Sequence, residues 1–149
     1  HDEISEGDMI NLSAPVGGFS IENTERPQLF IGSGVGMTPL VSMFKKAASL
    51  NVPTQMIQAV VTEDERPFAQ KLDSITDNYE QAQLHLHVKD KEGYLEAKEL
   101  EQYLSEQPEI YICGGTKFLH SIINSLKELN YDMNHVHFET FIPRLSVQV

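Results

Sequence analysis

The stretch from Leu29 to Leu40, with the sequence LFIGSGVGMTPL, constrains the fold more than any other part of the chain. It begins with a short apolar run, which is typical of a buried strand. A glycine-rich turn follows at residues 32–36. Thr38-Pro39 comes next, and proline is well tolerated in the first turn of a helix. Apolar residues then recur at roughly helical spacing as far as Leu50. The stretch therefore predicts a strand, a tight turn and a helix in succession.

Such a turn is suited to binding an anion. Glycine has no Cβ, so the backbone can approach a phosphate closely, and the free N–H groups at a helix start point toward it. The spacing Gly32-x-Gly34-x-Gly36 matches neither the G-x-G-x-x-G fingerprint nor the P-loop, which needs Lys-Ser/Thr after its last glycine. By itself the pattern indicates only a tight strand–helix turn. The Thr-Pro that follows makes a nucleotide site the more specific interpretation.

Length and charge limit the classes of protein. A chain of 149 residues makes one domain, or one domain and part of another. The net charge of −11 argues against nucleic acid and anionic membranes as partners. Cys113 is the only cysteine, which excludes an internal disulfide and fits a reducing cytoplasm. No transmembrane run or signal peptide is visible, and the chain opens on His1, so we expect a cytoplasmic fragment of a longer protein.

The chain divides near a polar linker at residues 22–27. Residues 1–21 have an extended, β-like pattern, and from residue 28 onward strands and helices alternate. Repeated β-α-β units predict a parallel sheet with right-handed crossovers and helices on both faces, a doubly wound α/β fold. Ligands of such sheets bind beyond the carboxyl ends of the strands. The predicted strands are 28–32, 55–61, 83–88, 109–113 and 136–141. The predicted helices are 38–50, 67–75, 97–104 and 117–129.

Three motifs fall at that carboxyl edge: GVGMTP at 34–39, CGGTKF at 113–118 and FETFIP at 138–143. In this order they resemble the NAD(P)H-binding module of the ferredoxin–NADP reductase superfamily, and within it the reductase half of bacterial flavohaemoglobins, the nitric oxide dioxygenases. Residues 13–19, SAPVGGF, resemble the end of that family's flavin barrel. The resemblance implies a barrel remnant over 1–26 and a five-stranded NAD(P)H-binding domain over 27–149.

The resemblance also implies an activity. Hydride would pass from NADH or NADPH to FAD, and electrons would then pass to the haem of a globin domain. FAD and haem would belong to the full-length protein, with the FAD-binding and globin domains in the same parent chain, and the isolated fragment would be inactive. Two alternatives stay open: the reductase component of another oxygenase system, and a nucleotide-binding fragment without activity of its own.

Residue roles follow from the same resemblance. Gly34 and Gly36 would admit the pyrophosphate, and Thr38 would bond near the nicotinamide or its ribose. Cys113 and Gly114 would lie beside the nicotinamide ring. The two catalytic positions, near the flavin, would be Glu139 and Phe141. The other residues expected to bind the cofactor are Val35, Met37, Pro39, Thr62, Glu63, Gly115 and Thr116. Two departures from the family pattern are Gly115, where proline is usual, and Ile142, where glycine is usual.

Other chemistry is disfavoured. The histidine nearest to Cys113 in sequence is His120, which we place down the following helix, so a thiol nucleophile is not expected. The pairs His85/His87 and His135/His137 would each share one strand face, but no cysteine or carboxylate completes a metal set at ligand spacing. Residues 90–99 resemble half an EF-hand loop, yet its first position would be a valine. We therefore expect no metal site, and a turn leading into a helix at residues 90–99.

The dinucleotide preferred is predicted from residues 62–66, TEDER, which follow the second strand. Acidic side chains at that position accept hydrogen bonds from a free ribose hydroxyl and repel a 2′-phosphate. Arg66 opposes this, because a guanidinium can bind a phosphate with two hydrogen bonds. Three acids against one arginine predict NADH over NADPH.

Overall fold

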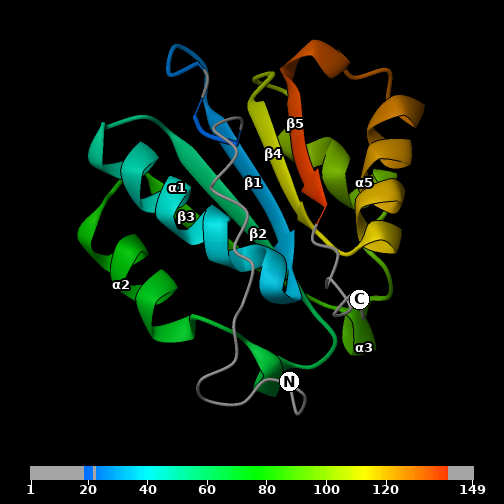
Figure 1. The fold of residues 1–149 in the computed structure, drawn as a ribbon, viewed down its shortest axis with the longest axis horizontal. Coiled ribbons are helices and arrows are strands. Elements are labelled where there is room, and N and C mark those ends of the chain that lie inside the picture. Colours follow the sequence, from blue (N-terminus) through cyan, green and yellow to red (C-terminus); the bar gives the residue numbers. More distant parts are fainter. Residues whose placement is uncertain (1–18, 22, 141–149) are drawn as a thin grey trace, which may run out of the picture.

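The computed structural model describes residues 19–21 and 23–140. Its centre is a five-stranded, all-parallel sheet in the order β3-β2-β1-β4-β5, with β3 and β5 at the two edges (Figure 1). This confirms the predicted α/β fold class. The strands are β1 Gln28–Ser33, β2 Thr54–Val60, β3 Ala82–Val88, β4 Glu109–Gly114 and β5 Val136–Thr140.

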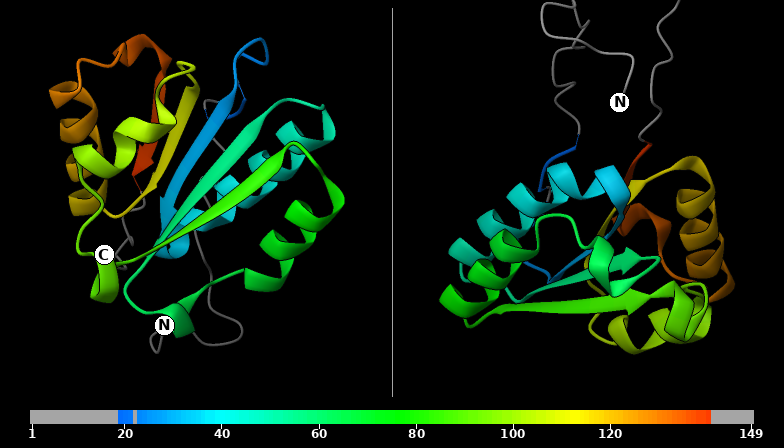
Figure 2. Two further views of the ribbon diagram at one scale, coloured as in Figure 1. Left: turned by 180° about the vertical axis from the view of Figure 1, so that it is seen from behind. Right: turned by 90° about the horizontal axis from the view of Figure 1, so that it is seen from below.

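Helices lie on both faces of this sheet, as the view along it shows (Figure 2). The α-helices are α1 Met37–Ser49, α2 Ala69–Asn78, α3 Lys89–Glu92, α4 Ala97–Leu100 and α5 Thr116–Glu128. Four 3-10 turns join them: η1 Gly34–Gly36, η2 Glu63–Glu65, η3 Glu101–Tyr103 and η4 Met133–His135. One core lies under α1 and α2, and the other lies under α4 and α5. The sheet is therefore doubly wound.

Strand alternation separates these two cores. Phe30 of β1, Met56 of β2 and Tyr111 of β4 are paired in register and pack toward α1. Their neighbours Leu29 and Ile110 face the opposite core. Because both faces are covered, the central strands β1 and β4 are buried along their length, which explains why they read as continuous apolar runs rather than alternating ones.

The two long helices end in the same way. Asn51 and Asn130 adopt left-handed backbone conformations, with φ of 60° and 57°, just beyond α1 and α5. The backbone amide of Asn51 donates to the carbonyl of Ala48, and that of Val52 donates to the carbonyl of Ala47. These two hydrogen bonds define a Schellman motif. The helix predicted at 38–50 therefore ends within one residue of the predicted position.

Most predicted boundaries are within one residue of the observed ones, and three regions differ by more. The helix predicted at 67–75 begins at Ala69, because Phe68 is left-handed with a φ of 61°. The helix predicted at 97–104 is the short α4 followed by the 3-10 turn η3. The turn predicted near residue 90 contains a helical turn, α3, which sequence reasoning missed. Most of the predicted barrel remnant, at residues 1–18 and 22, lies outside the described residues.

Candidate functional site

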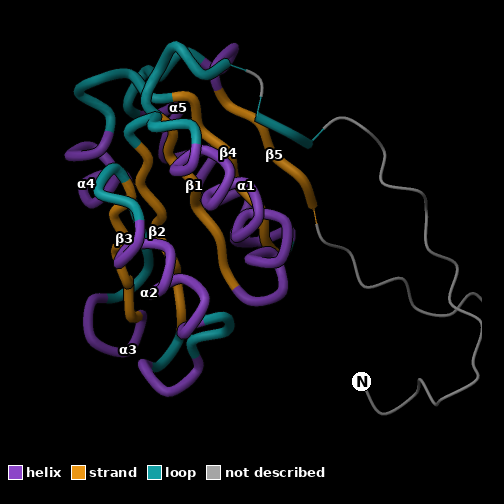
Figure 3. Tube along the Cα trace, turned by 90° about the vertical axis from the view of Figure 1, so that its left-hand side faces the viewer, coloured by secondary structure: helices purple, strands orange, loops and turns teal. Residues whose placement is uncertain are grey.

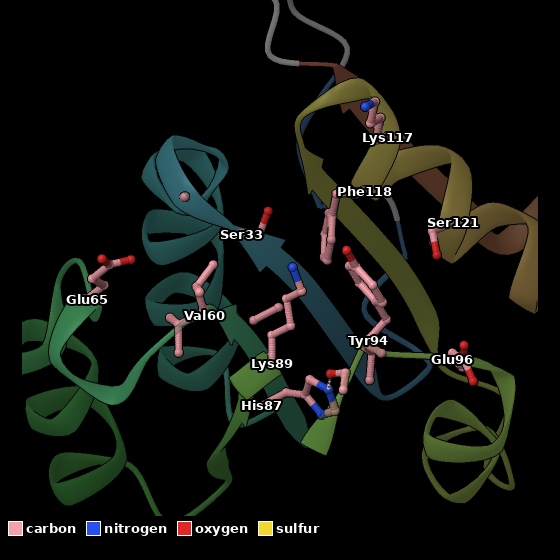
Figure 4. A pocket seen from close by; sticks show the side chains of 15 residues that line it. Ser33, Val60, Glu65, His87, Lys89, Tyr94, Glu96, Lys117, Phe118 and Ser121 are labelled. Carbon is pink, nitrogen blue, oxygen red and sulfur yellow. Dashed lines mark hydrogen bonds between the residues drawn. The ribbon is translucent and has the colours of Figure 1, made fainter. Parts of the chain in front are cut away.

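A cavity of about 670 Å³ opens at the carboxyl ends of β1, β2 and β3 and extends to the start of α5 (Figure 4). Figure 3 shows the strands across the view in the order β3, β2, β1, β4, β5 from left to right. The chain leaves β1 toward β2 on one side and β4 lies on the other, so this is the point where the strand order reverses. Open α/β sheets bind their ligands at that point. The cavity is lined by Ser33, Gly34, Ala59, Val60, Val61, Glu65, His87, Lys89, Gly93, Tyr94, Leu95, Glu96, Lys117, Phe118 and Ser121.

Two helix starts lie beside each other at this edge. The turn η1 continues into α1 at the end of β1, and α5 starts after Gly115 at the end of β4. These two strands are hydrogen-bonded neighbours. The first N–H groups of a helix have no partner within it and carry a partial positive charge. The sheet thus presents two sets of such donors at one place, which suits an anionic ligand in a chain of net charge −11.

The glycines of the turn have different structural roles. Gly34 has a φ of +54°, and nothing lies within 4 Å of the position that a Cβ would occupy, so the backbone is bare toward the cavity. A Cβ on Gly36 would lie 2.4 Å from the carbonyl oxygen of Cys113. Gly36 is therefore required because η1 packs against the backbone of β4.

The Cys113 side chain faces away from the cavity. It is 1% exposed and belongs to the core under α1. Burial first, and the charge of Glu139 second, raise the pKa of this thiol to about 11, against a smaller opposing effect of a backbone hydrogen bond from Gly114. A neutral, buried thiol is a poor nucleophile, which agrees with the prediction made from the sequence. His120 is exposed on α5.

Two aromatic side chains enter the cavity from opposite elements. Figure 4 shows Phe118, from α5, and Tyr94, from the loop after α3, both directed inward. The ammonium of Lys89 lies over the Tyr94 ring, 4.4 Å from its centroid. Tyr94 is 67% exposed, so its ring is available to a ligand. An exposed aromatic face beside a cation suits a planar base joined to a phosphate.

The loop that carries Tyr94 is fastened by His87. The His87 Nε2 atom lies 2.9 Å from the Gly93 carbonyl oxygen, which can only accept, so Nε2 carries the proton. His87 is 7% exposed, at the end of β3. The backbone amide of Val88 donates to Glu92 at 2.8 Å and closes the turn of α3. His87 thereby sets the position of the neighbouring tyrosine.

The acidic loop after β2 is partly neutralised. Lys91 donates to Glu63 at 2.6 Å, and this hydrogen bond, followed by the charge of Glu63, raises the pKa of Lys91. Arg66 donates to Asp73 at 3.1 Å and does not line the cavity. Glu65 does line the cavity and forms no ion pair within the described residues.

The described residues among the predicted site residues form two groups, one at the carboxyl ends of β1, β4 and β5 and the other beyond β2. Residues 34–39 and 113–116 meet at the ends of β1 and β4. Within the first group, Val35 and Thr38 are exposed, Pro39 is half-buried, and Met37 is fully buried with its side chain in the core. Thr62 and Glu63 lie apart, beyond β2. Glu139 is exposed on β5, and Phe141 lies outside the described residues.

Among the described residues that were predicted to bind the cofactor, Gly34 alone is part of the cavity wall, together with Glu65 from the acidic loop used to predict the dinucleotide. Sequence reasoning missed Lys89, Tyr94 and Phe118. The signal for the first two was present, because parallel strands end at one edge, so the residues after the third strand had to reach the same site as the glycine turn. The local pattern of residues 90–99 indicates only a turn leading into a helix.

The histidine pairs have structural partners. His85 bonds to Gln55 at 2.8 Å, and burial lowers its pKa. His135 lies in η4 rather than in a strand, so the predicted shared strand face with His137 is wrong; both instead contact Glu109, a carboxylate distant in sequence. Within the described part of the chain, no three His, Cys, Asp or Glu side chains are grouped to hold a metal ion. None of the described helices has the length and apolar character that a membrane span needs.

Comparison with known proteins places this geometry in a family. The model of the oxidoreductase NAD-binding domain matches residues 30–123. A flavohemoprotein of Bacillus cereus is 29% identical over 164 aligned residues, covering 99% of this chain and 41% of the relative. Flavohemoprotein B of Dictyostelium discoideum is 28% identical, with 99% of this chain and 38% of the relative covered. The chain thus spans about two fifths of the length of these relatives.

A solved structure shares the fold. The flavohem-like FAD/NAD binding domain of nitric oxide dioxygenase from Vibrio cholerae superposes with a TM-score of 0.73 at 25% identity, over 84% of this chain and 54% of that one. The expected ferredoxin reductase-like NAD-binding fold is therefore confirmed.

Proposed function

Because the chain belongs to the oxidoreductase NAD-binding domain family, we propose that it binds a nicotinamide dinucleotide in the cavity at the carboxyl edge of its sheet. The observation that carries this is the cavity itself, which joins the glycine turn after β1, the start of α5 and an aromatic lining at the strand-order reversal. Its volume of about 670 Å³ falls within the range of cofactor sites.

The residues present fit such a ligand. The pyrophosphate would lie against the bare backbone of Gly34 and the first N–H groups of η1 and α5. The adenine would stack on Tyr94 and contact Phe118, while Lys89 offers a positive charge to a phosphate. Residues 36–39 and 113–116 would then lie on the side toward the nicotinamide.

The wider role concerns a longer protein. We propose that residues 27–149 are the NAD(P)H-binding domain of a cytoplasmic reductase with flavin and globin domains, acting as a nitric oxide dioxygenase, and that residues 1–26 end its flavin barrel. When bound, the nicotinamide supplies a hydride to the flavin. Glu139 and Phe141 would lie near that flavin, at the end of β5. The flavohemoprotein relatives along nearly the whole chain support this assignment.

We propose NADH as the preferred dinucleotide. The carboxylate that supports this preference best is that of Glu65. Glu63 is paired with Lys91, whereas Glu65 lies on the cavity wall without an ion pair among the described residues. Glu65 would accept hydrogen bonds from the free ribose hydroxyls and repel a 2′-phosphate. Arg66, the residue that opposed this preference, is bonded to Asp73 and Gln58 instead.

The test is a titration of the 149-residue chain with ADP-ribose, in which binding is measured by calorimetry. We expect saturable binding, weakened about tenfold or more in Tyr94→Ala, because base stacking is worth roughly 1–3 kcal/mol. Leu50→Ala, which removes a comparably exposed apolar side chain at the far end of α1, is the matched control and should bind as the parent does. Absence of saturation at millimolar ADP-ribose would contradict the proposal.

A further inference from the structure

One buried amide on β2 holds the loop that connects β2 to α2. Gln58, near the end of β2, is fully buried. Its Nε2 donates to the Pro67 carbonyl oxygen at 2.8 Å, and its Oε1 accepts a hydrogen bond from Arg66 Nε at 3.4 Å. A buried amide whose nitrogen and oxygen are both bonded to one loop fixes that loop relative to the strand. Gln58 therefore positions residues 66–67, which directly follow Glu65 of the cavity wall.

A second contact joins the Arg66 side chain to α2. Its Nη2 donates to Asp73 Oδ1 at 3.1 Å, and the two groups form an ion pair. The guanidinium is thus bonded at both Nε and Nη2, to a strand on one side and to a helix on the other. Arg66 does not line the cavity, although the preceding residue, Glu65, does. The two contacts keep the positive charge out of the site.

The backbone of the same loop is held in an unfavourable conformation. Phe68 has a φ of 61°, which is unusual for a bulky side chain. Its ring is 41% exposed, so burial of the ring does not account for this backbone. The Phe68 carbonyl accepts from the amide of Leu72, and the preceding carbonyl, of Pro67, accepts from Gln58. Such strain persists where the surrounding contacts determine the conformation, which is the role that Gln58 has here.

We propose that Gln58 and Asp73 are positioning residues for the choice of dinucleotide, because they hold the Arg66 guanidinium away from the cavity; this rests on the dinucleotide site proposed above. Glu65 and Arg66 are adjacent, carry opposite charges and have opposite effects on a ribose 2′-phosphate. Of the two, Glu65 alone lines the cavity, so the site favours a free ribose hydroxyl. Gln58 and Asp73 do not line it, and they act through Arg66.

Release of Arg66 changes the ligand that the same cavity prefers. Asp73 is exposed on α2, so its side chain can be removed without disturbing the core. Nη2 then has no other acceptor among the described residues. The guanidinium is free to turn from its place next to Glu65 and to bind a 2′-phosphate with two hydrogen bonds. Ligands with a 2′-phosphate gain affinity from this change, and ligands with a free hydroxyl do not.

Competition titrations of the 149-residue chain with ADP-ribose and 2′-phospho-ADP-ribose test the proposal. In Asp73→Ala we expect the affinity for 2′-phospho-ADP-ribose, relative to ADP-ribose, to rise about fivefold or more. Asp77→Ala is the matched control, because it removes an exposed carboxylate one turn later on α2 that has no ion pair within the described part of the chain. Its ratio should change by less than about twofold. Equal changes in the two variants would overturn the proposal, since the ratio would then follow net charge alone.

A double-mutant cycle shows whether Arg66 is responsible for the effect. Arg66→Leu alone should leave the affinity ratio near that of the parent, because the guanidinium is held away from the ligand. Asp73→Ala should then have no further effect in the Arg66→Leu background. An effect of Asp73→Ala that persists without Arg66 would overturn the proposal. So would a loss of 2′-phospho-ADP-ribose binding in Arg66→Leu alone, because Arg66 would already contact the phosphate.

Gln58→Met tests the buried amide, because it nearly keeps the volume and removes both hydrogen bonds. We expect the affinity ratio to move in the same direction as in Asp73→Ala, and the shift to vanish when Arg66→Leu is added. Urea denaturation shows whether this variant is folded, and the Asp73→Ala cycle decides the matter if it is not. A folded Gln58→Met with the parent ratio would overturn the role of Gln58. If neither ligand saturates the parent chain, the dinucleotide site itself is refuted, and the role of Arg66 with it.

Discussion

The Cys113 and Glu139 residues are register partners on the neighbouring strands β4 and β5, at the carboxyl edge of the sheet. Their side chains therefore share a sheet face, the thiol buried and the carboxylate exposed. Burial and then the charge of Glu139 raise the pKa of Cys113 to about 11. The pair links a residue expected beside the nicotinamide to one expected beside the flavin.

The first prediction concerns the reactivity of that thiol. At pH 8 a pKa of about 11 in place of 9.0 leaves roughly 100-fold less thiolate, so alkylation of folded Cys113 by iodoacetamide should be slower than that of a model thiol by at least this factor. Glu139→Gln should lower the pKa and speed the reaction. A rate that rises with an apparent pKa near 9 in the parent chain would contradict this.

The same shift makes stability depend on pH. The folded pKa lies above the unfolded one, so the contribution of the neutral thiol is complete below about pH 9 and is lost as the pH rises through about 11. We expect the free energy of unfolding to fall more steeply between pH 9 and 11 in the parent than in Cys113→Ala, which lacks the thiol. Urea denaturation of both proteins measures this. Parallel curves would refute the linkage.

Two glycine substitutions should distinguish the cost of backbone strain at Gly34 from the cost of steric overlap at Gly36. In Gly36→Ala the new Cβ would lie 2.4 Å from the Cys113 carbonyl oxygen, which is backbone and cannot swing aside. We expect a loss of about 3 kcal/mol or more of unfolding free energy. Gly34→Ala meets no atom within 4 Å and has only the cost of a φ of +54°, about 1–2 kcal/mol. Chemical denaturation gives both values, and similar losses in the two variants would show that the packing against β4 is not decisive.

His87 should affect nucleotide binding without touching the nucleotide's phosphates. Replacing it by Leu removes the hydrogen bond to Gly93 and frees the loop that carries Tyr94. ADP-ribose affinity should fall about 3- to 10-fold. His85→Leu is the matched control, because His85 lies two residues earlier on β3 and bonds to Gln55. Calorimetry on both variants decides the matter, and equal effects would place the cause in β3 itself.

The preference between dinucleotides should respond most to Glu65. Glu65→Ser removes the unpaired carboxylate on the cavity wall and should improve binding of 2′-phospho-ADP-ribose relative to ADP-ribose by about 3- to 10-fold. Glu63→Ser should have the smaller effect, because Lys91 already neutralises that charge. Competition titrations with the two ligands measure the ratio. A parent chain that binds the 2′-phosphorylated ligand about tenfold more tightly would show that Lys89 outweighs Glu65.

Local patterns determined the architecture. The apolar runs that became β1 and β4 indicated strands covered on both faces, and parallel neighbours need a crossover such as a helix, so the alternation of strands and helices favoured a doubly wound sheet. Asn51 marked the end of α1 by the same local logic, since asparagine tolerates the left-handed conformation that a Schellman motif needs. These signals depend on residues that are close together in the chain, so they can be recognised from the sequence alone.

The tertiary structure decided which side chains meet. Lys89 of α3 and Tyr94 of the following loop come after β3, whereas Phe118 belongs to α5 after β4, and the strand order β3-β2-β1-β4-β5 brings them to one cavity. Glu109 reaches His135 and His137 across 26 and 28 residues, and the acids after β2 differ only because Lys91 of α3 reaches Glu63 and not Glu65. Pairings of this kind depend on register and strand adjacency, which no local propensity encodes. The family motifs indicated a dinucleotide domain, while the packed sheet selected the side chains available to serve it.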